Sequence, residues 1–161
     1  MGTFDVTASG NLNTTEVKRT PTTAVLSGLA IPPVLFPKQR VLEFERGTPT
    51  QKYSLATDWE KGAFGGTFRA THYGNVLVPQ SNLAGTYEIA SAVILDLEGR
   101  VELGKFDFAL GVNDLLDEYP SMAPVAFNGV NINLNGPAAF SSFSPFGFGG
   151  RYVHAKVGYK W

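Results

Sequence analysis

The chain has 161 residues, enough for one domain, and its formal net charge of −1 argues against a broad nucleic-acid-binding surface. It has no cysteine, which excludes a disulfide scaffold and a thiolate metal site. Its 18 glycines, 10 prolines and 12% aromatic residues are typical of many strands joined by turns and not of a helical bundle.

Six segments alternate between apolar and polar residues, which predicts β-strands with two unlike faces. In chain order they cover residues 4–17, 52–59, 64–73, 87–103, 105–112 and 151–161. The last one ends on Trp161, and every second residue counted back from it is apolar or aromatic. A closing strand of this kind is typical of an outer-membrane barrel, with lipid on one face and a wet lumen on the other.

The connections between these segments alternate in length. Residues 18–50 and 117–149 form long connections, residues 75–86 form a medium loop, and the turns at 60–63 and around Gly104 are tight. Short periplasmic turns and long extracellular loops are typical of a barrel, whereas long structureless loops are uncommon in a compact soluble domain. This pattern predicts that the C-terminus and the aromatic residues near it lie at the periplasmic interface.

Charge pairing selects a register for the hairpin at Gly104. Pairing Glu102 with Lys105 sets Arg100 opposite Asp107 on the polar face. A slip by one residue would send charges to the apolar face, at about 2–4 kcal/mol for each Arg or Lys near the bilayer midplane. We therefore predict the Glu102–Lys105 register.

Two longer motifs resemble one known family. Residues 108–120, FALGVNDLLDEYP, resemble the penultimate-strand motif of TonB-dependent outer-membrane receptors, except that Leu116 stands where the family usually has Phe. Residues 144–152, SPFGFGGRY, together with the terminal strand, resemble the C-terminal signature of that family. Residues 47–55 and 69–74 resemble upstream barrel strands, so the resemblance covers most of the chain.

The resemblance implies a barrel of about 22 strands with a plug inside it. In this family a periplasmic TonB system pulls on the plug to admit iron–siderophore complexes, cobalamin or sugars. The fold class that we predict is all-β: an antiparallel meander of about six transmembrane strands from the C-terminal portion of such a barrel, with residues 1–161 as a single region and the plug absent.

The start of the chain has no secretory signal and no TonB box, so we expect a piece of a longer protein that does not transport alone. Six strands are also fewer than the roughly eight of the smallest single-chain barrels. The expected function is the barrel wall of a receptor for active uptake of a scarce nutrient such as an iron–siderophore complex, in the outer membrane of a Gram-negative bacterium. The expected partners are outer-membrane lipid, the barrel-assembly machinery, the remaining strands and plug and, through that plug, the TonB system; no nucleic acid is expected.

No enzymatic activity, cofactor or metal site is expected. The two histidines, His72 and His154, lack ligand spacing, and the serines of the last long loop have no positioned base. The alternating charges around Glu98 suit a wet barrel wall better than acid–base catalysis. The acidic residues of the 108–120 motif suit turn capping better than cation binding, and they are Asp114, Asp117 and Glu118.

Two sets of residues are candidates for function. The candidate ligand contacts are polar-face residues and loop aromatics, namely Lys52, Arg69 and Tyr73 with Phe127, Phe140, Phe143 and Phe146. The candidate barrel-assembly signal is the apolar side of the last strand, namely Val153, Ala155, Val157, Tyr159 and Trp161.

Two other readings stay open. One is a stand-alone small porin-like barrel or adhesin that closes by oligomerising or by an additional strand in the 18–50 connection, where residues 41–45 alternate. The other is a soluble β-sandwich binding module whose apolar face is a core. The need for detergent would separate the sandwich from both membrane readings.

Overall fold

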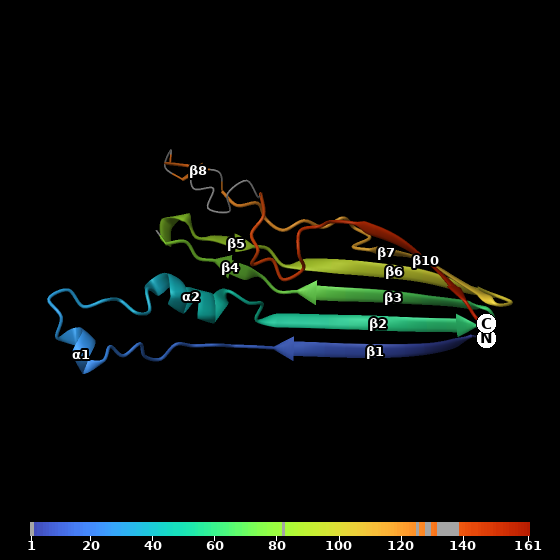
Figure 1. Cartoon of the computed structure of the whole chain (residues 1–161), viewed down its shortest axis with the longest axis horizontal. Helices are drawn as coiled ribbons and strands as arrows, with labels where there is room; N and C mark the ends of the chain where they lie inside the picture. Colours follow the sequence, from blue (N-terminus) through green and yellow to red (C-terminus); the bar gives the residue numbers. More distant parts are fainter. Residues whose placement is uncertain (1, 82, 125, 128–129, 132–138) are drawn as a thin grey trace.

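A six-stranded antiparallel sheet dominates the computed structural model, which describes residues 2–81, 83–124, 126–127, 130–131 and 139–161. Its strands follow chain order as a meander: β1 (Thr3–Leu12), β2 (Gln51–Lys61), β3 (Phe64–Tyr73), β6 (Ala92–Leu103), β7 (Phe106–Asn113) and β10 (Tyr152–Tyr159). Figure 1 shows both termini and the short hairpin turns at one end, which we call the turn end. The opposite end is called the loop end.

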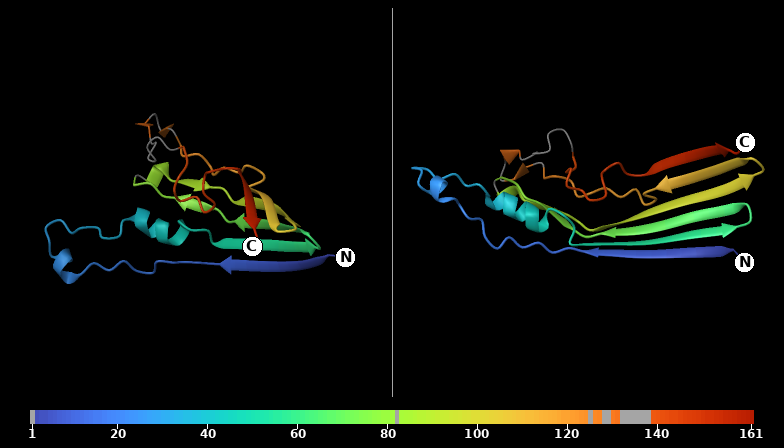
Figure 2. Two further views of the ribbon diagram at one scale, coloured as in Figure 1. Left: turned by 45° about the vertical axis from the view of Figure 1, so that its right-hand side comes forward. Right: turned by 60° about the horizontal axis from the view of Figure 1, so that its bottom comes forward.

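The sheet is open. Its two edges are β1 and β10, and Figure 2 shows the termini at opposite edges of a curved sheet. The predicted largely antiparallel β-structure is therefore confirmed, while the described residues form no closed barrel.

The loop end carries the other elements. They are α1 (Ala24–Ser27), α2 (Lys38–Arg46), β4 (Val76–Val78), the 3-10 turn η1 (Leu83–Gly85), β5 (Tyr87–Ile89), β8 (Ala126–Phe127) and β9 (Val130–Asn131). Strands β4 and β5 pair as a short hairpin, and α2 lies against β4 (Figure 1). We call this hairpin, α2 and residues 139–150 the end module.

The additional strand suggested within 18–50 was wrong, because residues 41–45 lie in α2. The helix starts directly after Pro37 and ends directly before Gly47, and proline and glycine commonly flank helices in this way. Five alternating residues are too few to outweigh these two boundary signals. Gln39, Leu42 and Glu43 lie at helical spacing and are half-buried, as are Val41 and Glu45.

Two predicted strand boundaries were also wrong. The first strand ends at Leu12 and not near residue 17. The fourth predicted segment is two strands, because β5 leaves the sheet to pair with β4, and Ala90 N–H donates to Ser121 Oγ at 3.1 Å where the chain changes partners. Alternation alone did not reveal this break, since the pattern continues across it.

The predicted register of the β6–β7 hairpin was wrong by two residues. Leu103 pairs with Phe106, and Arg100 lies opposite Ala109. The cause is Gly104, whose φ of 64° fills the first position of a two-residue loop, the position that takes glycine in a type II′ hairpin. A shift by two residues preserves which face each side chain occupies, so the predicted faces stand.

The two faces of the sheet differ sharply in composition. One face, hereafter the apolar face, carries large hydrophobic side chains on all six strands, yet Leu97, Phe108 and Val157 are 48%, 39% and 69% exposed. The buried hydrophobic residues of the described chain are Val76, Val78 and Ile89, which all lie in the end module. The apolar face therefore has no core against it within the described residues.

Candidate functional site: the polar face of the sheet

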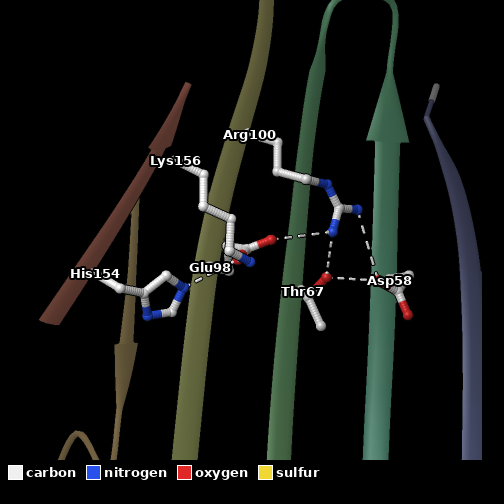
Figure 3. Close-up of polar contacts among 6 residues, drawn as sticks. All are labelled: Asp58, Thr67, Glu98, Arg100, His154 and Lys156. Carbon is white, nitrogen blue, oxygen red and sulfur yellow. Dashed lines mark hydrogen bonds and ion pairs between the residues drawn. The ribbon is translucent and has the colours of Figure 1, made fainter. Parts of the chain in front are cut away.

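The opposite face, hereafter the polar face, carries a hydrogen-bonded charge network near its centre (Figure 3). Strand pairing places Asp58, Thr67 and Glu98 in one row across β2, β3 and β6. The same row continues through Gly111 on β7 to His154 on β10. One row of the antiparallel ladder thus brings together residues that lie far apart in the sequence.

Glu98 is the acceptor at the centre of this network. One of its carboxylate oxygens, Oε2, is 3.1 Å from His154 Nε2 and 2.8 Å from Lys156 Nζ. Its other oxygen is 3.6 Å from Nη1 of Arg100. Arg100 also donates to Thr67 Oγ1 at 2.7 Å, and Thr67 donates in turn to Asp58 at 2.5 Å. The network neutralises its charges internally across β2, β3, β6 and β10.

Two glycines make room for the long side chains of this network. A Cβ added at Gly111 would lie 2.4 Å from the His154 ring, and one added at Gly65 would lie 3.3 Å from Arg100 Nε. His154 therefore crosses β7 to reach Glu98, and Arg100 crosses β3. This role of Gly65 and Gly111 was not predicted; the available signal was a small residue at a polar-face position between strands that carry charged side chains.

A second ion-pair group lies at the turn end of the same face. Lys160 Nζ is 3.1 Å from Glu102 and 3.2 Å from Asp107. These hydrogen bonds, first to Glu102 and then to Asp107, raise the pKa of Lys160 above its usual value. They also link the residue that follows β10 to the hairpin of β6 and β7.

The acidic motif after β7 forms a turn, as predicted from its capping chemistry. Asp114 and Asp117 adopt positive φ values of 51° and 62°. The Asp114 carboxylate accepts from Glu118 N–H at 3.0 Å, and the Asp117 carboxylate accepts from Arg151 N–H at 2.8 Å. The carboxylates of Asp114 and Asp117 therefore bind backbone N–H groups, and Asp117 ties the segment after β7 to the start of β10.

The structure brings together three of the predicted ligand-contact residues. Lys52 Nζ lies 4.7 Å from the ring centroid of Tyr73, whose ring is 5.9 Å from that of Phe146. Phe146 also packs against the small core of the end module. Arg69 lies on the same face as Tyr73, four residues nearer the turn end.

The other predicted loop aromatics lie elsewhere. Phe140 stacks between Tyr119 and Phe148, with ring centroids 5.7 Å and 6.5 Å apart. Phe143 has no ring contact among the described residues and is partly exposed. The side chain of Phe127 lies outside the described residues. The predicted loop cluster is thus divided, and only Phe146 reaches the polar-face candidates.

The predicted assembly residues of β10 share the apolar face. Tyr159 packs against Phe106 at 5.1 Å between ring centroids, and Trp161 meets Tyr159 edge-on at 5.7 Å. Val153 and Val157 are exposed. Ala155 lies opposite Leu110 on β7.

Within the described part of the chain, no group of three or more His, Asp or Glu residues could hold a metal ion. His72 lies on the apolar face and stacks on Tyr53 with ring centroids 6.0 Å apart. No helix among the described residues has the length and apolar character to cross a membrane.

No protein-family model, no curated protein and no solved structure matches this chain.

Proposed function

We propose that the chain is a barrel-wall segment of a TonB-dependent outer-membrane receptor, with its apolar face toward lipid and its polar face toward an aqueous lumen. The observation that carries this proposal is the exposed apolar face. Burying an exposed Leu or Val side chain is worth about 1.5–3 kcal/mol, so a sheet with this face in water is strongly unfavourable. Contact with lipid hydrocarbon would remove the apolar face from water without a second protein layer.

The polar face supports the same proposal. Its network holds carboxylates, cations and a hydroxyl in direct contact, and several of these side chains remain partly open to solvent. A β-sandwich would bury one face of the sheet against a second sheet. No described element covers the apolar face in that way.

The sheet edges favour a segment of a larger wall over a complete small barrel. Both β1 and β10 have one unpaired side among the described residues. In lipid, each unsatisfied backbone group costs several kcal/mol, so further strands must continue the sheet at both edges. In the proposed receptor these strands come from the rest of the barrel.

The distribution of aromatic residues and loops also fits this orientation. Trp59, Phe64, Phe106, Tyr159 and Trp161 lie at or near the turn end of the apolar face. Aromatic rings of this kind favour the interfacial layer of a bilayer. In this proposal the turn end is periplasmic and the end module extracellular, and active nutrient uptake would involve a plug and the TonB system.

The proposal is tested by quenching of tryptophan fluorescence with lipids brominated on their acyl chains. Two single-tryptophan variants of the full chain, both carrying Trp59→Phe and Trp161→Phe, place the probe on opposite faces: Leu97→Trp on the apolar face and Ala109→Trp on the polar face. We expect strong quenching for Leu97→Trp and little for the matched Ala109→Trp control. A detergent-independent folded monomer that resists quenching at both positions would overturn the proposal.

A further inference from the structure

Charged side chains are distributed unevenly between the two faces of the sheet. Strand pairing places every Asp and Glu of the six strands on the polar face. The apolar face of these strands carries one Lys or Arg, namely Lys61, which ends β2 two residues after Trp59. Lys105, in the turn between β6 and β7, joins it, because its ammonium lies 5.9 Å from the centroid of the apolar-face ring of Tyr159. Both lysines lie at the turn end.

These two lysines have no carboxylate partner. No ion pair among the described residues involves Lys61 or Lys105, and both side chains are exposed. The acidic residues nearest to them in sequence are Glu60, Glu102 and Asp107, which lie on the opposite, polar face. Two of those three carboxylates are already paired there with another lysine. The charge of Lys61 and Lys105 is therefore available to an anion on the apolar side of the turn end.

Large apolar side chains lie beside each lysine. Phe64 pairs with Lys61, and Leu103 and Phe106 flank the turn that holds Lys105. All three apolar side chains are exposed. An ammonium group next to an apolar surface matches an amphiphile, since the lysine can bind a phosphate group while an acyl chain covers the apolar side chains. A free phosphate ion would use only the first of these two features.

The spacing of the two lysines indicates two separate contacts. Strand β3 lies between β2 and β6, so Lys61 and Lys105 are two to three strand spacings apart, roughly 12 Å. One phosphate group cannot bridge that distance, and each lysine therefore offers its own site. Toward the loop end, the apolar face of the six strands carries no Lys or Arg. The attraction for anions on this face is thus confined to one end of the sheet.

We propose that Lys61 and Lys105 bind the phosphate groups of anionic phospholipids in the bilayer leaflet at the turn end, with the acyl chains along the apolar face. This inference rests on the proposed function, because it needs the apolar face to meet lipid. The aromatic rings of Trp59, Tyr159 and Trp161 favour the interfacial layer and hold this end of the sheet at that depth. A lysine at the level of anionic headgroups is attracted to them, and salt weakens the attraction.

The test uses the full chain refolded into vesicles of phosphatidylcholine and phosphatidylglycerol, with one of the two lipids brominated near the carbonyl end of its acyl chains. The reporters are the two tryptophans of the chain, Trp59 and Trp161, which lie at the turn end. At equal mole fractions, stronger quenching by brominated phosphatidylglycerol measures the preference for the anionic lipid. We expect a preference of roughly fivefold at each lysine. Lys61→Gln and Lys105→Gln should each remove part of it, and the double variant should show none.

Two control variants separate charge from structure. Lys61→Arg combined with Lys105→Arg keeps both positive charges and should keep the preference. Lys156→Gln removes a cation from the polar face, where it is paired with Glu98, and should leave the preference unchanged. Glycerol phosphate in solution tests whether the headgroup alone is enough. It should not reduce the preference, because it has no acyl chain to cover the apolar side chains beside the lysines.

Three results would overturn the inference: equal quenching of the parent chain by both lipids, an unchanged preference in the double glutamine variant, or loss of the preference in glycerol phosphate. The Leu97→Trp and Ala109→Trp probes separate this failure from a failure of the proposed function. A chain with quenching specific to the apolar face but no lipid preference keeps the barrel wall and loses the headgroup sites. A chain that prefers phosphatidylglycerol at the turn end but shows no quenching of Leu97→Trp binds the vesicle surface and does not span the bilayer.

Discussion

The six-stranded sheet and the end module differ in how far they bury their hydrophobic side chains. The end module buries Val76, Val78 and Ile89 to within 3% exposure, although its strands have three residues each. The sheet has strands of eight to twelve residues and buries no large hydrophobic side chain to that extent. Small hydrophobic clusters are expected in water, whereas a long uncovered sheet is not. In the proposed orientation this contrast follows from two different surroundings, hydrocarbon for the apolar face and water for the end module.

The largest expected effect comes from placing a charge on the apolar face. Leu97→Arg should destabilise the folded chain in vesicles by about 2–4 kcal/mol, because in the proposed orientation the guanidinium would face hydrocarbon near the middle of β6. The matched control is Ile94→Arg, three residues away on the polar face of the same strand. Urea titrations followed by tryptophan fluorescence measure both. Equal, small effects would mean that both faces of the sheet lie in water, and they would contradict the proposed difference between the sheet and the end module.

The next effect tests the end module as a separate core. Ile89→Ala should lower the local free energy of opening by about 2–3 kcal/mol, since it removes a fully buried side chain from a small cluster. Hydrogen exchange should then accelerate in β4 and β5 and stay unchanged in the centre of the sheet. Ile31→Ala, at an exposed loop position, is the control and should change neither region. Faster exchange throughout β6 and β7 would show that both regions unfold together.

Sequence reasoning found the strands and their faces because period-two alternation persists through long segments such as β6 and β10. It missed the β6–β7 register because cross-strand charge pairing was weighed above the position of Gly104 in its loop. It also missed α2, whose five alternating residues fit two patterns at once. Within the site, Lys52 and Tyr73 were predicted on one face, but the row that joins Asp58, Thr67, Glu98 and His154 depends on strand register, which the sequence did not determine.

A smaller effect tests whether the polar network needs the room that Gly111 leaves for the His154 ring above β7. Gly111→Ala should cost about 1–3 kcal/mol, because the new methyl group would displace the His154 ring from Glu98. Gly99→Ala is the matched control, since a Cβ there meets nothing within 4 Å. In a His154→Ala background the cost of Gly111→Ala should largely disappear. A cost that persists there, measured by the same urea titration, would assign it to the backbone and not to the network.

The smallest effect concerns the pH dependence of the ion pairs at the turn end. Because Glu102 and Asp107 raise the pKa of Lys160 in the folded chain, this lysine contributes stability that is fully present below its unfolded pKa of about 10.4. That contribution is lost as the pH rises through the higher folded pKa. Lys160→Met should therefore lower stability slightly at pH 8, and the difference from the parent chain should shrink by pH 12. Lys61→Met, a turn-end lysine without a carboxylate partner among the described residues, is the control. A constant difference across this pH range would mean that Lys160 acts through packing of its aliphatic stem. Ion pairs would then contribute less to stability at the turn end of the polar face than in the network around Glu98.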